Sequence, residues 1–174
     1  MINVELITVE DIKDYSPISA SVSADLISPF ITMAQTFHIK PCLGQTLYME
    51  LIDAVSGDTL SGSNYTLLSQ YVSPALIWYS YYEAFPFIWS RTNAKGVTKG
   101  YSDSTTSLDK KEFEMMKQEL LDRAVGFKNL MIDYLNDNLS TFPSYGTDGS
   151  SSKDNSSGIY LGKIRSNNSL YGCS

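Results

Sequence analysis

Histidine, cysteine and basic residues are all scarce in this sequence. Its 174 residues include one histidine and two cysteines, and 13 Lys and Arg stand against 19 Asp and Glu, for a net charge of −6. Proteins that wrap nucleic acid nonspecifically need clustered Lys and Arg to contact its phosphates. The charge therefore excludes that class, although an acidic surface would let DNA pass without sticking.

Long apolar runs are missing as well. No stretch approaches the roughly 18 consecutive apolar residues that mark a membrane span. The chain opens with MINVELITVEDIKDY, which is acidic and lacks the apolar core of a signal peptide. We therefore expect no membrane attachment, and a reducing compartment in which Cys42 and Cys173 stay free thiols.

The sequence also lacks the usual catalytic and metal-binding motifs. It contains no CxxC, HExxH, GxSxG or P-loop pattern. His38 and Cys42 are four residues apart, but Pro41 lies between them, so we interpret His38 as an ordinary histidine at a helix end. Acidic and basic residues mix over Glu112–Arg123 as on a solvated helix face. We predict no catalytic residue, no metal and no cofactor.

The sequence is rich in apolar residues spaced three or four positions apart. This spacing is typical of amphipathic helices. The capping-box pattern TVED predicts a short helix over Val9–Tyr15. A second helix is expected from about Ser23 to His38, with Phe37 on its apolar face and Pro41 ending the segment. Pro29 either kinks this helix or takes its first position.

Three more helices follow the same pattern. They are expected over Leu43–Val55, from Asn64 to about Arg91 with Pro74 as a break or a new start, and over Leu108–Leu139. We therefore predict an all-α fold, a small bundle of about four main helices plus the short N-terminal one, as one domain over residues 1–145. The last helix carries one continuous apolar stripe, formed by Phe113, Met116, Leu120, Ala124, Phe127, Met131 and Tyr134.

The helix before it is apolar on two sides. One face carries Ile77, Tyr81, Ala84 and Ile88. The neighbouring face carries Trp78, Tyr82, Phe85 and Trp89. A helix that is apolar on more than one side is buried on more than one side. The alternatives are a central core helix and a helix whose second, aromatic face forms an interface with another subunit.

A long polar link, Arg91–Ser107, joins the last two helices. A link of this length inside a compact domain is usually functional or mobile, and its glycines would also allow a small hairpin. Its positive charges beside a tyrosine either contact phosphate or are simply solvated. The candidate contact residues of this loop are Lys95, Val97, Lys99 and Tyr101.

The C-terminal tail, residues 146–174, differs from the domain in composition. It has three basic and two acidic residues, a net charge of +1 that leaves −7 on the domain, and Gly146–Gly158 has the composition of a flexible linker. Ordering such a tail costs about 1–2 kcal/mol per residue, so we expect another chain to supply the contacts. Beyond this linker, residues 159–171 are expected to form an extended segment that binds to the surface of a partner. The predicted anchors are Ile159, Tyr160, Leu161, Ile164, Leu170 and Tyr171.

The order of several motifs resembles the head–tail connector (adaptor) proteins of tailed bacteriophages, in particular those of Bacteroides-type phages including the crAss-like group. The chain begins with T-x-x-D-I-x-x-Y at Thr8–Tyr15 and continues with I-x-P-x-L-G-x-x-L-Y-x-x-L at Ile39–Leu51. Three later stretches are similar to the core helix, the inter-helix loop and the end of the last helix in that family. They are SPALIWYSYYEA (73–84), KGVTKGYSDSTTSLDKKEFEMM (95–116) and YLNDNLSTFPSY (134–145).

The resemblance implies a structural virion protein without enzymatic activity. Copies of such a helical bundle form a ring, typically of twelve subunits, below the portal, where the ring joins the capsid to the tail and continues the DNA channel. The implied partners are other copies, the portal protein and tail or further ring proteins, with DNA passing without specific binding. The chain would be made in the host bacterial cytoplasm and reside at the capsid–tail junction. The alternatives are a stopper or tail-completion protein and a helical protein-binding module.

Overall fold

The computed structural model describes residues 4–96 and 110–147, and every regular element in these ranges is a helix. The predicted all-α fold is confirmed. The tail anchors, the loop residues Val97, Lys99 and Tyr101, and Cys173 lie outside the described residues.

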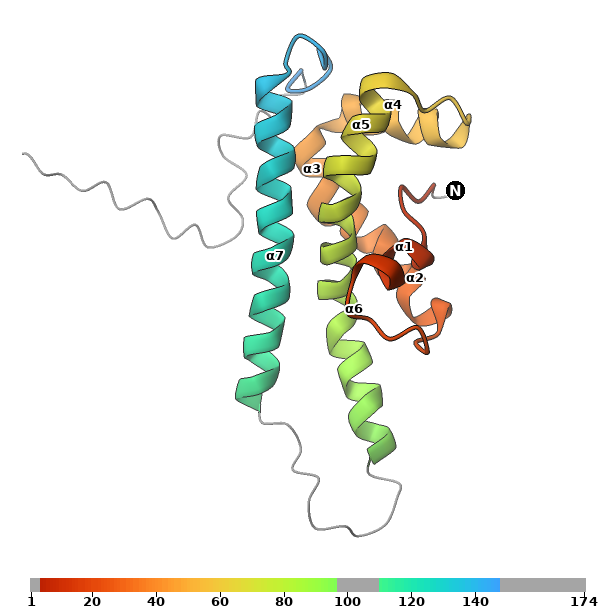
Figure 1. Cartoon of the computed structure of the whole chain (residues 1–174), viewed down its shortest axis with the longest axis vertical. Coiled ribbons are helices and arrows are strands. Elements are labelled where there is room, and N and C mark those ends of the chain that lie inside the picture. The colour runs from red at the N-terminus through yellow and green to blue at the C-terminus, as the bar shows by residue number, and fades with distance from the viewer. Residues whose placement is uncertain (1–3, 97–109, 148–174) are drawn as a thin grey trace, which may run out of the picture.

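Three long elements form the bundle. The helices α6 (Ser73–Gly96) and α7 (Lys110–Asp137) run antiparallel, side by side, and α2 (Ala24–Ala34) packs on the other side of α6 (Figure 1). At 28 residues α7 is the longest helix in the described ranges, as its stripe predicts. The link begins later than expected, because Arg91–Gly96 belongs to the last turns of α6.

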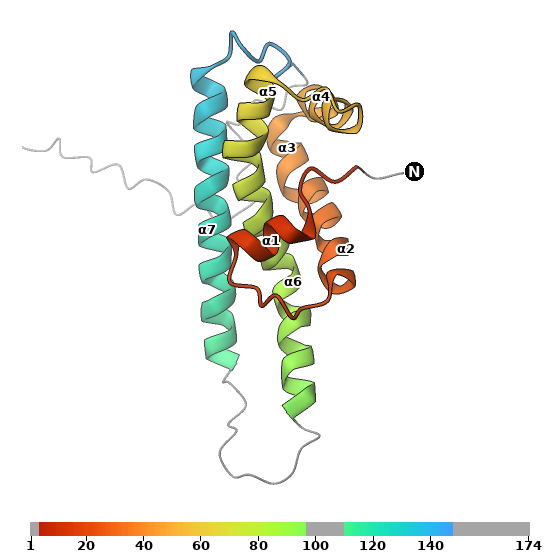
Figure 2. The ribbon, with the colours of Figure 1, turned by 45° about the vertical axis from the view of Figure 1, so that its right-hand side comes forward.

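The short helix α1 (Val9–Tyr15) starts at the predicted capping box. The Thr8 hydroxyl accepts the backbone N–H of Asp11 at 3.1 Å, and the Asp11 carboxylate accepts the backbone N–H of Thr8 at 2.7 Å. Ile12 is fully buried, so α1 packs through one face against α2 and α6 (Figure 2). This element confirms the reading of the TVED pattern.

Two π-turns interrupt the regular helices, each just before a proline. The turn η1 (Gln35–Ile39) follows α2, and η2 (Leu68–Val72) follows the short helix α5 (Gly62–Leu67). The residue after each π-turn donates its backbone N–H to the carbonyl oxygen five residues earlier. The proline is the residue that follows this donor. Inside an α-helix a proline ring clashes with the carbonyl four residues earlier, and a wider turn moves that carbonyl aside.

The π-turns correct the predicted helix ends. Pro41 does not end its segment, because α3 (Lys40–Leu43) continues the helical path and stops at Gly44. Pro74 lies in the first turn of α6, directly after η2, which agrees with the expected new start better than with a break. Pro29 is not a first helical residue either, since α2 begins after Ser23 and runs through it.

Gly44 turns the chain from α3 into α4 (Gln45–Ser56), which lies across one end of the bundle (Figure 1). Its dihedral angles are φ 79° and ψ 160°, a region that is nearly restricted to glycine. We expect Gly44→Ala to lower the free energy of unfolding by about 1–3 kcal/mol. Urea denaturation of the full chain measures this loss.

Gly126 in α7 provides the matched control. It is exposed, and a Cβ added there meets no atom within 4 Å. Alanine is a better helix former than glycine, so Gly126→Ala is expected to raise the free energy of unfolding by about 0.5–1 kcal/mol. Equal effects of the two substitutions would contradict the conformational role of Gly44.

The N-terminal segment is attached to η1 through one buried polar side chain. Gln35 is 2% exposed, and its Oε1 accepts the backbone N–H of Leu6 at 2.9 Å. Its Nε2 donates to the carbonyl oxygen of Val4 at 2.9 Å and to the Tyr48 hydroxyl at 2.8 Å. One side chain thus joins the N-terminal segment, η1 and α4.

The core lies between α6 and the helices on its two sides. Met131 and Leu135 of α7 are fully buried in it, as are Ile31, Leu47 and Leu76. The predicted α7 stripe is corrected at both ends: Met116 is 43% exposed, and Leu135, outside the stripe, is fully buried.

Candidate functional site

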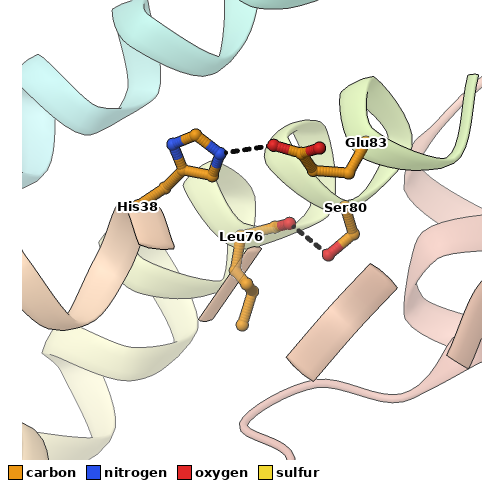
Figure 3. Close-up of polar contacts among 4 residues, drawn as sticks. All are labelled: His38, Leu76, Ser80 and Glu83. Carbon is orange, nitrogen blue, oxygen red and sulfur yellow. Dashed lines mark hydrogen bonds and ion pairs between the residues drawn. The ribbon is translucent and has the colours of Figure 1, made fainter. Parts of the chain in front are cut away.

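Chemically active side chains gather where η1 meets α6. His38 Nε2 and a Glu83 carboxylate oxygen are 2.7 Å apart, and each side chain is about one quarter exposed (Figure 3). The His38 ring stacks on Tyr79 with centroids 4.1 Å apart and planes 6° apart. Tyr79 and Glu83 are one turn apart on α6, so a single imidazole contacts both. Cys42 Sγ, from α3, donates to the His38 carbonyl at 3.1 Å.

Ser80 lies next to this cluster but is not available as a nucleophile. It is fully buried, and its hydroxyl donates to the Leu76 carbonyl at 2.7 Å within α6 (Figure 3). A serine bonded to its own helix four residues back has its hydroxyl proton engaged. This contact is structural.

The thiol and the phenol of the cluster are both held in their protonated forms. Burial raises the pKa of Cys42, and the positive charge of Lys128 opposes this only in part. Burial also raises the pKa of Tyr79, with Cys42 and Tyr82 adding to the shift. A protonated thiol is a weak nucleophile and a weak metal ligand. In the described ranges, no group of three or more His, Cys, Asp or Glu residues could hold a metal ion.

The raised pKa of Tyr79 predicts a loss of stability at alkaline pH. Above pH about 10 the unfolded chain loses this proton while the folded chain keeps it, so the free energy of unfolding falls as pH rises. Tyr79→Phe is expected to reduce that decline, measured by urea denaturation between neutral and alkaline pH. Identical curves for wild type and Tyr79→Phe would contradict this role.

The aromatic face predicted from the sequence meets α7 of the same chain. Phe85 stacks on Phe113 with centroids 5.2 Å apart and planes 17° apart, and Trp89 approaches the same ring at 5.6 Å. Phe85 is 3% exposed. These contacts favour the core-helix alternative for this part of the face.

Two cations complete the contact between the helices. Lys117 Nζ lies 5.4 Å from the centroid of the Tyr82 ring, and the Arg123 guanidinium lies 5.2 Å from that of Trp78. Each such contact contributes about 0.5–1 kcal/mol at an exposed site. Trp78, Tyr82 and Trp89 remain partly exposed, so their role in a subunit interface stays a prediction. Lys95 is in the last turns of α6, and its side chain lies outside the described residues.

An exposed apolar patch lies on the other side of α6, and the sequence did not predict it. Phe37 is 64% exposed, Phe87 53% and Met33 37%, and the buried Phe30, at 8%, lies beneath them with its ring 5.0 Å from that of Phe87. We call these four residues the apolar patch. The periodicity placed Phe37 on the buried face, but η1 changes the helical register, so that Gln35 and Ile39 are buried and Phe37 faces outward.

Comparison with protein families assigns this helical core. A model described as a family of unknown function, DUF6712, matches residues 39–155, well over half of the chain. The chain belongs to DUF6712. The match to DUF6712 begins at the last residue of η1 and includes α3 to α7. Comparisons with curated proteins and with solved structures gave no match. In the parts of this DUF6712 protein that the structure describes, no helix is long and apolar enough to cross a bilayer.

Proposed function

We propose that this protein is a structural virion subunit that forms an oligomeric ring below the portal of a tailed phage. The ring would join the capsid to the tail and continue the DNA channel, with a geometric rather than a chemical mechanism. Its partners would be other copies of the chain, the portal protein, and tail or further ring proteins. The order of the connector-like motifs along residues 4–145 supports this proposal.

The observation that carries the proposal is the apolar patch. Phe37 of η1 and Phe87 of α6 are each more than half exposed, and Phe87 contacts Phe30 of α2. Exposed aromatic side chains on packed helices mark contact with another macromolecule. The chemically active side chains, by contrast, are engaged with one another around His38. Exposed aromatic side chains, beside a polar cluster whose members are engaged with one another, suit a protein that assembles.

The charge of the chain suits a channel for DNA. The domain carries −7 and the tail +1, so a ring of these domains would repel the phosphate backbone and let it slide. We expect the purified full chain to show no binding to duplex DNA in a filter or mobility assay at low salt. Tight binding that weakens steeply with salt would contradict an inert lumen.

Imaging of the particle tests the proposal directly. A phage that carries this chain with a C-terminal tag would be imaged by single-particle cryo-EM with symmetry relaxed at the portal vertex. The expected result is a ring of helical density against the portal, with tag density on each subunit. Density at the tip of the neck would assign a stopper or tail-completion protein instead. A particle without the chain would overturn the proposal.

A further inference from the structure

Three of the four residues of the apolar patch are accessible on the surface of the domain. Phe30, Met33 and Phe37 lie on successive turns of α2 and η1, and Phe87 joins them from α6. On a helical wheel Phe87 is about 200° from Phe85, so the patch faces away from α7. Aromatic surface of this kind needs an apolar occupant to cover it.

The chain itself contains a segment with the chemistry to fill this patch. From Ile159 to Tyr171 apolar and aromatic residues recur in a polar background, and Lys163 and Arg165 give the segment positive charge. The domain it would contact carries −7, and Glu83 lies one turn from Phe87 on α6. Apolar anchors with a complementary charge favour this segment as the occupant.

The length of the linker indicates whether the segment docks on the patch of its own chain or on that of another copy. Ser144 donates to Glu50 of α4 at 2.8 Å, so the chain leaves the domain at the α4 end of the bundle. The patch is level with the start of α7. Phe87 is two residues from Phe85, which stacks on Phe113, and His38, next to Phe37 in the sequence, contacts Tyr82, whose ring lies under Lys117. At about 1.5 Å per residue, that level is about 30–36 Å from the end of α7.

Residues 148–158 must bridge this distance before the first anchor. Fully extended, they reach about 36 Å, which leaves almost no length for a path around the bundle. As a flexible Gly/Ser-rich chain, the same linker has an average end-to-end distance of about 18 Å. The segment therefore reaches its own patch only when almost fully stretched, whereas a second copy is free to place its patch within the relaxed reach of the linker.

We propose that the segment Ile159–Tyr171 of one copy docks on the apolar patch of the next copy. This contact is heterologous, since one copy gives the tail and the other gives the patch, and repeated contacts of this type close into a ring when the rotation permits. The inference deepens the proposed ring function by naming the element that links its subunits.

Complementation between two full-length variants tests the docking. The patch variant, Phe37→Gln with Phe87→Gln, keeps its tail, and the anchor variant, Ile159→Ser with Leu161→Ser, keeps its patch. Sedimentation velocity over a dilution series is expected to show larger species for the wild type and monomers for each variant alone. An equimolar mixture is expected to form a species of twice the monomer mass, because one productive tail–patch pair remains.

Controls separate docking from folding and from the ring function. Phe37 and Phe87 are exposed, so the patch variant should keep the wild-type circular dichroism spectrum, and Leu130→Gln at a 57% exposed site on α7 should keep the wild-type mass distribution. A wild type that stays monomeric throughout, or a mixture that stays monomeric, would overturn the docking. If the particle shows the ring but the mixed variants stay monomeric, the docking is rejected and the ring function stands. If the mixed variants dimerise but the particle shows no ring, the ring function is rejected and the docking stands.

Discussion

Leu135→Asp is expected to unfold the domain. Leu135 is fully buried in the core cluster, near the end of α7, where it lies with Met131 and Ala124. The substitution removes a large apolar side chain and buries a carboxylate within an apolar cluster. Losses above about 4 kcal/mol are typical of this combination, and they approach the whole stability of a small domain. The far-UV circular dichroism spectrum of the full chain should lose most of its helical signal.

Leu130→Asp is the matched control on the same helix. Leu130 is 57% exposed, so the same chemical change there costs only the lower helix propensity of aspartate, about 0.5 kcal/mol. A normal helical spectrum and a near-normal urea midpoint are expected. If Leu135→Asp folded as well as Leu130→Asp, the assignment of the buried face of α7 would be wrong.

Gln35→Leu is expected to have the second largest effect, although leucine has a similar size and is more apolar. Gln35 bonds the Leu6 N–H, the Val4 carbonyl and the Tyr48 hydroxyl. Leucine leaves all three without this partner, and each buried polar group left unpaired costs about 1–3 kcal/mol. Because Val4 is only partly buried and water can replace one bond, we expect a total loss of about 2–4 kcal/mol.

Two further measurements make the Gln35 prediction specific. Hydrogen exchange at the Leu6 amide should accelerate in Gln35→Leu, since its acceptor is gone. Gln118→Leu is the control, because Gln118 bonds Asp122 on the exposed face of α7, and its removal should change stability by less than about 0.5 kcal/mol. A destabilised variant with unchanged Leu6 exchange would show that Gln35 acts through packing alone.

Helix existence was predictable because it depends on local periodicity. The spacing of apolar residues located α1, α2, α4 and α7 to within a few residues, and the bundle of four main helical runs follows from it. The π-turns were not predictable, because a proline usually ends a helix and nothing local signals that the preceding turn will widen. That one local event exposes Phe37, which the spacing places on the apolar face.

The candidate site was less predictable than the fold because it depends on tertiary contacts. His38 and Glu83 are 45 residues apart in the sequence. Glu83 lies in an aromatic stretch, and nothing in that stretch indicates that its carboxylate binds His38. Periodicity predicts an aromatic face on α6, but it cannot tell whether α7 or another subunit covers that face. The apolar patch is not predictable from the sequence for the same reason, since exposure is a property of the assembled helices.

The attachment of the N-terminal segment to Gln35 has a consequence for the order of folding. Gln35 is 29 positions from Leu6 and 31 positions from Val4 in the sequence. Its side chain can bind them only after η1 has formed its wide turn. Helices and short-range hairpins form before contacts that close long loops. The N-terminal segment is therefore expected to dock late, on a partly formed bundle, and its docking would lock the widened turn that keeps Phe37 facing outward.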